Sequence, residues 1–216
     1  MTLVMTLLAR DEIDVVDSWL AFHLNAGADL VIATDNRSQD GTTEVLEEYV
    51  RSGHVHLIRE PGEDLRQNEW VTRMARLAAT EYGADWVINS DADEFWWPRG
   101  GSLKDVLGTV PDRFGVVRGC WRHFLPRPDD GAFFAERMTV RLATPAAPGD
   151  KETIFHAHQK VAHRARADVA EGRAGVPGVV RRRVVDRTGG ARRIHPRLHG
   201  PLRCGSDALR TAVRGR

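Results

Sequence analysis

The sequence predicts an α/β protein built on a mainly parallel sheet flanked by helices. Short apolar runs recur along the N-terminal part, stretches of helical spacing lie between them, and the connections are short. Because parallel strands need a crossover connection, this β-α-β-α-β-α-β order predicts a parallel sheet with helices on its faces. In such sheets, ligands bind at the carboxyl ends of the strands.

Apolar runs mark four strands and periodic stretches mark the helices between them. The predicted strands are Leu3–Leu8, Asp29–Thr34, His54–Ile58 and Asp85–Asn89, and the predicted helices are Glu12–Ala26, Thr42–Arg51 and Leu65–Tyr82. The first strand is wholly apolar, as expected for a strand covered on both faces. Gly27 is a plausible stop for the first helix, and Ser38 or Asp40 is a suitable N-cap for the second.

After Pro98 the pattern becomes looser. Ser102–Leu107 predicts a short helix, and Gly115–Cys120 and Phe133–Leu142 predict strands that add to the sheet in antiparallel orientation. These elements extend the sheet beyond the parallel core.

The composition is that of an ordinary globular protein. The chain has 216 residues, of which 42% are hydrophobic and 28% charged, enough for one large domain. A formal net charge of +1 gives no reason to expect a nucleic-acid partner.

Cys120 and Cys204 form neither metal-ligand spacing nor a disulfide framework, which favours a cytoplasmic location. The apolar start, Met1–Ala9, is too short for a signal peptide, and no run predicts a membrane span.

The composition changes in the C-terminal part. From His156 onward there is no Phe, Tyr or Trp, and arginines are dense among Gly, Ala and Val. Such a stretch has few side chains able to build a core, so residues 166–216 are expected to form a poorly ordered tail. A shifted reading frame in a GC-rich gene would produce this bias, and we favour that explanation. The alternative is a genuine basic tail that meets anionic lipid or polymer, with peripheral association at the inner face of the membrane.

Two carboxylates directly follow the fourth strand. Asp91 and Asp93, one residue apart at a strand end, can share a divalent cation, and Mg²⁺ and Mn²⁺ prefer such oxygen ligands. The cation would neutralise the charge that builds on a leaving nucleoside diphosphate. The alternative interpretation is an acidic turn, but the position after the fourth strand favours the metal site.

Asp35 ends the second strand and is the next candidate. In a parallel sheet it lies near the exit of the first strand, at Arg10–Glu12, where a carboxylate can accept hydrogen bonds from a ribose or a base. The alternative is that Asp35 and Asn36 simply make a turn. Neither a G-x-G-x-x-G fingerprint nor a G-x-x-x-x-G-K-[ST] phosphate loop is present.

Taken together, these motifs resemble the glycosyltransferase family 2 type, in particular the bacterial branch related to family 92. The matching stretches are Leu8–Glu12, His23 with Gly27–Asp29, Thr34–Thr42 and Asp85–Phe95. The resemblance covers about residues 1–165 and implies a glycosyltransferase A-type domain, with 1–97 as its nucleotide-sugar half and 98–165 as its acceptor half. It also implies a nucleotide-diphospho-sugar donor, Mn²⁺ or Mg²⁺, and transfer to an unknown glycan, lipid or small-molecule acceptor, usually with inversion.

The resemblance also suggests roles for single residues. Asp35 would hold the nucleoside, Asp91 the ribose or the metal, and Asp93 the metal, with Arg10 beside them. Inversion requires a general base in the acceptor half, and Asp129 and Asp130 are the candidates, although the Pro and Gly residues around them equally indicate an exposed turn.

Further side chains complete the predicted site. Lys160 is a candidate for a phosphate or acceptor, as cations hold a departing diphosphate. His156, His158 and His163 are weaker metal candidates, because such clusters are more often solvated surface. Trp96 and Trp97 could stack on a sugar, or pack in the core or at the rim.

Two other functions compete with a metal-dependent glycosyltransferase. A nucleotidyltransferase would need a Gly-rich basic loop after the first strand, which Ala9–Glu12 lacks. A degenerate module that binds nucleotide sugar without turning it over is the second rival, because the C-terminal segment looks truncated or frameshifted.

Overall fold

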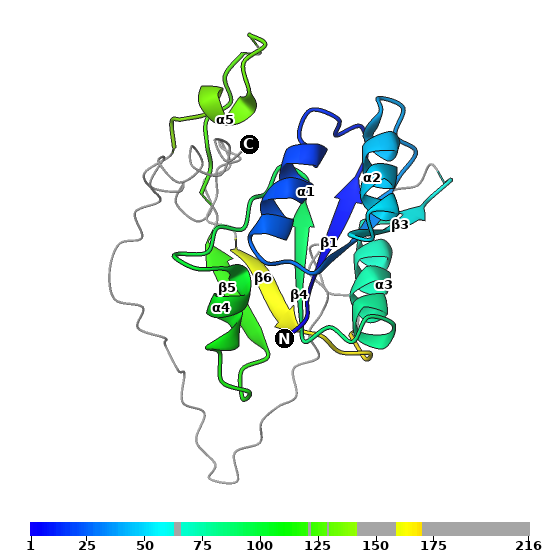
Figure 1. The fold of residues 1–216 in the computed structure, drawn as a ribbon, viewed down its shortest axis with the longest axis vertical. Coiled ribbons are helices and arrows are strands. Elements are labelled where there is room, and N and C mark those ends of the chain that lie inside the picture. The colour runs from blue at the N-terminus through cyan, green and yellow to red at the C-terminus, as the bar shows by residue number, and fades with distance from the viewer. Residues whose placement is uncertain (63–65, 121, 129, 142–158, 170–216) are drawn as a thin grey trace, which may run out of the picture. The chain divides into compact units, whose positions relative to one another are not determined.

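The computed structural model describes residues 1–62, 66–120, 122–128, 130–141 and 159–169 (Figure 1). These residues fall into two compact units. The larger unit contains residues up to 120 together with 159–169, and it holds the whole sheet. The smaller unit contains the described residues from 122 to 141. The predicted arginine-rich tail lies, from residue 170 onward, outside the described residues.

The sheet has six strands in the order β3-β2-β1-β4-β6-β5. The strands are β1 (Leu3–Ala9), β2 (Leu30–Asp35), β3 (Val55–Arg59), β4 (Trp86–Asp91), β5 (Val116–Cys120) and β6 (Gln159–Arg164). The first four pair in parallel, and β6 joins β4 and β5 in antiparallel orientation. The predicted α/β class with a mainly parallel sheet is therefore confirmed.

Helices cover both faces of this sheet. The helices of the larger unit are α1 (Val16–Asn25), α2 (Thr42–Arg51), α3 (Gln67–Thr80) and α4 (Leu103–Gly108). Alternate residues of β1 face opposite sides, as the pleat of a strand dictates. Leu3, Met5 and Leu7 share one core with α1, α2 and α4. Val4 shares the other core with α3. Among the described residues, no helix is both long and apolar enough to cross a membrane.

The smaller unit differs from the sequence prediction. Four residues of the predicted strand Phe133–Leu142 form instead a one-turn helix, α5 (Phe134–Arg137), so that prediction was wrong. The amide of Met138 donates to the carbonyl of Phe134, and Ala, Glu and Arg in this turn are good helix formers. Only an isolated bridge between Phe124 and Arg141 resembles a strand in the described part of this unit.

Strand β6 was not predicted. Its sequence, Gln-Lys-Val-Ala-His-Arg, contains a single β-branched residue, Val161, and two central residues that are fully buried, Ala162 and His163. The strand forms because β4 and β5 supply partners on both sides. Tertiary pairing thus overrides a weak local preference.

Candidate functional site

The carboxyl ends of β2, β1 and β4 lie side by side and form what we call the ligand edge. It comprises Asp35, the β1–α1 loop at Arg10–Ile13, and the turn Asp91–Glu94. The parallel register pairs Asp35 with Ala9 and Asp91 with Leu8. Asp35 and Asp91 therefore flank the end of the central strand, as the sequence pattern predicts for a parallel sheet.

Hydrogen bonds join the β1–α1 loop to the β2–α2 loop. The four bonds run from the amide of Asp11 to Ser38 Oγ (3.0 Å), of Glu12 to Thr42 Oγ1 (2.8 Å), of Ile13 to Asp40 Oδ2 (2.9 Å) and of Gln39 to Asp11 Oδ1 (2.8 Å). These bonds satisfy amides that the loops would otherwise leave unpaired. Two loops from neighbouring strands thereby act as one support.

The start of α2 differs in detail from the predicted cap. Neither Ser38 nor Asp40 is the N-cap residue; Gly41 is, with a φ of 107° that favours glycine. Asp40 nevertheless accepts hydrogen bonds from the amide and hydroxyl of Thr42 through Oδ1, at 3.0 and 2.6 Å. Desolvation raises the pKa of Asp40, but the hydrogen bonds from Thr42 and from the amide of Ile13 together outweigh it and lower the pKa, so the residue is ionised at neutral pH.

Asp35 is buried, and both of its carboxylate oxygens accept hydrogen bonds. Oδ1 accepts from the amide and hydroxyl of Ser38 at 3.1 and 2.6 Å, and Oδ2 accepts from the hydroxyl of Thr43 at 2.5 Å. The carboxylate therefore supports the β2–α2 loop. A carboxylate has about four lone-pair sites, so acceptor capacity for a nucleoside remains.

Arg10 lies on the exposed side of the same edge. Its Nη1 is 3.4 Å from Asn36 Oδ1, and Nε is 4.0 Å from Asp11 Oδ2. Asn36 is buried and donates to the carbonyl of Gly62 at 2.9 Å. With its side chain 57% exposed, the guanidinium is accessible to an anionic ligand.

The turn after β4 is fixed by hydrogen bonds of its own. The amide of Glu94 donates to the carbonyl of Asp91 at 3.1 Å, and Glu94 Oε2 accepts from the amide of Asp91 at 3.2 Å. Ser90 Oγ donates to the carbonyl of Glu94 at 3.1 Å. Asp91 ends the strand partly exposed, and Asp93 is fully on the surface of the turn. The turn thus presents two carboxylates on a rigid support.

Helix α1 holds the same turn from behind, which sequence reasoning missed. Trp19 Nε1 donates to the carbonyl of Glu94 at 2.9 Å, and the amide of Trp96 donates to His23 Nε2 at 3.0 Å. His23 Nδ1 lies 2.9 Å from the carbonyl of Trp19, which assigns the proton to Nδ1. Burial lowers the pKa of His23 to about 3, so the imidazole is neutral and accepts from Trp96. The available signals were helical spacing and, for His23, its place in one of the family-like stretches, and neither indicated a contact with this turn.

Lys160 reaches the turn from β6. Its Nζ lies 2.8 Å from Asp91 Oδ2 and 3.0 Å from Glu94 Oε2. Burial raises the pKa of Glu94 to about 7, although the ammonium opposes this effect. The sequence suggested a phosphate or acceptor role for Lys160, and neither its contact with Asp91 nor that with Glu94 was anticipated.

Acidic side chains crowd the ligand edge. Glu12 has its pKa raised to about 7, first by burial and then by the nearby charges of Asp93, Asp14, Asp40 and Asp91. Several carboxylates acting on one another indicate a negative potential at this edge, which attracts a cation. Sequence reasoning placed Glu12 at the exit of β1 but gave it no role.

The donor set agrees with a hard divalent cation that shares its ligands with a substrate. The described part of the chain contains no group of three or more His, Cys, Asp or Glu side chains that could hold a metal ion by themselves. Mg²⁺ commonly binds through one or two carboxylates and completes its shell with phosphates and water. Asp91 and Asp93 are accessible enough to supply such a partial set.

The remaining candidates have other surroundings. Asp129, His156 and His158 lie outside the described residues. Asp130, in the smaller unit, is exposed and accepts from the amide of Ala132 at 3.0 Å, as in a turn. His163 is buried within the sheet, between β4 and β5, and the prediction of a solvated cluster is wrong for this residue.

The two tryptophans after the turn differ in exposure. Trp96 packs on the backbone of β5, where a Cβ at Gly119 would lie 3.0 Å from its ring. Trp97 is 38% exposed and stacks on Phe22 at 5.8 Å between ring centroids. Trp96 therefore packs against the sheet, and Trp97 offers a ring to the surface.

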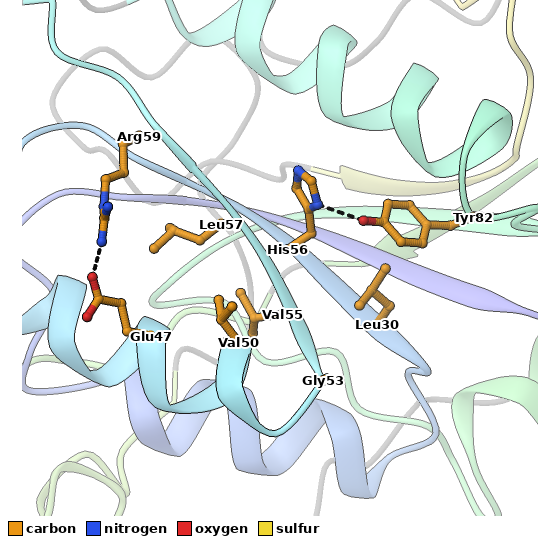
Figure 2. Close-up of a pocket in the computed structure, with 9 residues that line it drawn as sticks. All are labelled: Leu30, Glu47, Val50, Gly53, Val55, His56, Leu57, Arg59 and Tyr82. Carbon is orange, nitrogen blue, oxygen red and sulfur yellow. Dashed lines mark hydrogen bonds and ion pairs between the residues drawn. The ribbon is translucent and has the colours of Figure 1, made fainter.

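A separate pocket lies beside the edge strand β3. It is lined by Leu30, Glu47, Val50, Gly53, Val55, His56, Leu57, Arg59 and Tyr82. Figure 2 shows the Arg59–Glu47 ion pair at one end and the hydrogen bond between His56 and Tyr82 at the other, with aliphatic side chains between them. None of the predicted site residues lines this pocket.

Comparison with protein families adds an independent finding. Residues 9–113 match the model of glycosyltransferase family 92, a segment that is just under half of the chain and includes Arg10, Asp35, Asp91 and Asp93. The predicted glycosyltransferase type is thereby confirmed. No curated protein sequence matches the chain.

Several solved structures are similar to part of the chain. Residues 1–349 of Staphylococcus aureus TarS share 13% identity with a TM-score of 0.36, covering 50% of this chain and 31% of that chain. Glucosyl-3-phosphoglycerate synthase from Mycobacterium tuberculosis, in complex with Mn²⁺, UDP and glucosyl-3-phosphoglycerate, shares 21% identity with a TM-score of 0.36, covering 53% and 42%. The chain thus spans less than half the length of either structure.

Proposed function

We propose that the ligand edge binds a nucleotide-diphospho-sugar together with Mn²⁺ or Mg²⁺, and that the protein transfers the sugar to an acceptor. The observation that carries this proposal is the register that sets Asp35 and Asp91 on either side of β1, within a segment matched by a glycosyltransferase family. Nucleotide ligands of open α/β sheets bind at this kind of edge.

Each side chain then has a role that follows from its position. Asp35 accepts hydrogen bonds from the nucleoside, and Arg10 contributes positive charge beside it. Asp91 and Asp93 hold the metal, and Asp91 can also bind the ribose. A bound divalent cation would neutralise the charge on the departing diphosphate. Lys160 supplies a second positive charge to the phosphates, a role that its ion pair with Asp91 supports.

The transfer itself is a displacement at the anomeric carbon. The acceptor hydroxyl oxygen forms the new bond, the bond to the diphosphate oxygen breaks, and the electron pair leaves with the nucleoside diphosphate. The hydroxyl proton passes to a general base, for which Asp129 and Asp130 remain the predictions. In-line attack gives inversion.

Titration calorimetry with UDP and with GDP, each with and without Mn²⁺, tests this proposal. We expect metal-dependent binding of one nucleotide by the parent, and loss of that metal dependence in Asp93→Ala, because Asp93 is exposed and supports no buried contact. Asp112→Ala, also an exposed carboxylate but in the α4–β5 connection, is the matched control and should bind as the parent does. Equal Mn²⁺-dependent affinity in Asp93→Ala and the parent would remove the metal assignment.

A donor hydrolysis assay separates the enzyme from its rival. Slow, Mn²⁺-dependent release of sugar from the nucleotide sugar that binds best supports a transferase. Binding without hydrolysis or transfer supports the degenerate binding module.

A further inference from the structure

The structure contains a positive charge of its own at the site proposed for the metal. Lys160 Nζ lies 2.8 Å from Asp91 Oδ2 and 3.0 Å from Glu94 Oε2. We propose that this ammonium competes with a divalent cation for Asp91, so that the metal binds well only when a diphosphate is present to take up Lys160. The inference rests on the proposed function and adds the order in which its ligands assemble.

The ammonium is held in place by the fold. Lys160 lies in β6, opposite Gly119 of β5 and two residues before Ala162, which pairs with β4. The side chain of Lys160 is 23% exposed and that of Glu94 13% exposed, so solvent screens their interaction only in part. A partly buried ion pair is stronger than one on the open surface.

A divalent cation on Asp91 would meet this charge directly. The carboxylate oxygen that would bind the metal already accepts from Lys160, and two cations close together repel each other strongly where water is partly excluded. Metal binding without nucleotide must therefore move the ammonium away from Asp91, so that Lys160 keeps only its ion pair with Glu94. This displacement lowers the affinity for free metal.

A diphosphate changes the balance. Its oxygens offer the ammonium a new anion, and they also complete the metal shell. Nucleotide and metal should therefore strengthen each other's binding, and thermodynamic linkage makes the effect equal in both directions. Removing the ammonium should weaken this coupling while strengthening the binding of metal alone.

Calorimetric titration of the full chain with MnCl₂, with and without UDP, tests the inference. Lys160→Met removes the charge and keeps most of the stem, and without UDP it is expected to bind Mn²⁺ about tenfold more tightly than the parent, as expected when a nearby charge of the same sign is removed. UDP should then increase its Mn²⁺ affinity less than it does in the parent. Lys160→Arg keeps the charge and should behave as the parent.

Lys104→Met is the matched control. It removes an ammonium from the ion pair with Asp29, at the amino end of β2, and should leave Mn²⁺ binding unchanged. Circular dichroism verifies folding, and Lys160→Gln serves as a second neutral variant if Lys160→Met melts early.

The outcomes separate this inference from the proposed function. Unchanged or weaker Mn²⁺ binding in both neutral variants of Lys160 overturns the competition, whatever the parent binds. If the parent then still binds UDP in a Mn²⁺-dependent manner, the proposed function stands alone. If the parent binds no nucleotide, the proposed function fails by itself, and a tenfold gain of Mn²⁺ affinity in the neutral variants still supports the competition.

Discussion

His23 is a buried, neutral histidine whose two nitrogens connect α1 to the turn after β4. Nδ1 bonds to the carbonyl of Trp19 and Nε2 accepts from the amide of Trp96, three residues beyond Asp93. A histidine that burial keeps neutral makes the fold sensitive to acid, because at low pH the imidazole is protonated in the unfolded chain but not in the folded one. Its role is to position the turn.

Replacement of His23 by Phe should therefore destabilise the fold in a pH-dependent manner. At pH 7 we expect a loss of about 2–4 kcal/mol, because the amide of Trp96 and the carbonyl of Trp19 each lose a hydrogen bond to the imidazole. The pKa of His23 falls from 6.5 in the unfolded chain to about 3, so the parent loses stability as the pH falls below 6.5. The Phe variant lacks this loss, and the cost of the substitution should shrink by about 2 kcal/mol between pH 7 and pH 5. Urea unfolding at both pH values measures the difference.

The exposed His54 provides the control. His54→Phe should leave the acid sensitivity of the parent intact. A cost of His23→Phe that is equal at both pH values would contradict the assignment of a neutral imidazole.

At the scale of elements, the site depends on two loops that are hydrogen-bonded into one support. Asp40 is central, because it accepts from Ile13 of the β1–α1 loop and from the first residue of α2. The carboxylate at the start of α2 also faces the positive end of the helix dipole. The loops should therefore hold Arg10 and Asp35 in a fixed relation.

Asp40→Ala should loosen this support more than it weakens the fold. We expect the melting temperature to fall by a few degrees and the affinity for the bound nucleotide to fall about tenfold, because the charge-assisted hydrogen bond from Ile13, the one of its three bonds that joins the two loops, is of that size. Asp105→Ala removes the capping box of α4 with Ser102 and is the matched control. It should lower the melting temperature without changing nucleotide affinity. Equal nucleotide affinity in both variants would show that the loop bonds do not shape the site.

The parallel part of the sheet was predictable because its signals are local. The strands β1 to β4 are apolar runs separated by periodic stretches, and a parallel register places Asp35 and Asp91 at one edge without further information. Lys160 could be named only as a cation near phosphates, since its contact with Asp91 spans 69 residues and depends on the insertion of β6. The prediction of a strand at Phe133–Leu142 was wrong because a short run containing apolar residues does not by itself distinguish the two-residue period of a strand from the 3.6-residue period of a helix.

At the scale of the whole molecule, the core is closed by residues 159–169. Ala162 is fully buried against one face, and Val169 packs with α3 on the other, where Arg76 Nε donates to its carbonyl at 2.7 Å. The segment beyond residue 170 lies outside the described residues, and the sequence predicts that it adds little to the core, because it lacks aromatic side chains.

Truncation after Val169 should therefore have little effect on the melting temperature. Truncation before Gln159 should lower it strongly, because it removes β6, leaves β5 without its partner and exposes the edge of β4. Differential scanning calorimetry of both truncated chains measures the contrast. A large loss of stability in the longer truncated chain would mean that the arginine-rich segment packs on the domain.

The strand order has a consequence for synthesis on the ribosome. β6 lies between β4 and β5 in the sheet, yet it follows both along the chain. While the protein is being made, β5 emerges before β6, the strand that connects it to the sheet. Until β6 emerges, the edge of β4 that β6 will cover has no partner strand. The acidic turn is likewise made long before its ammonium. Only when Gln159–Arg164 has been made can β6 pair with β4 and β5, and only then can Lys160 pair with Asp91.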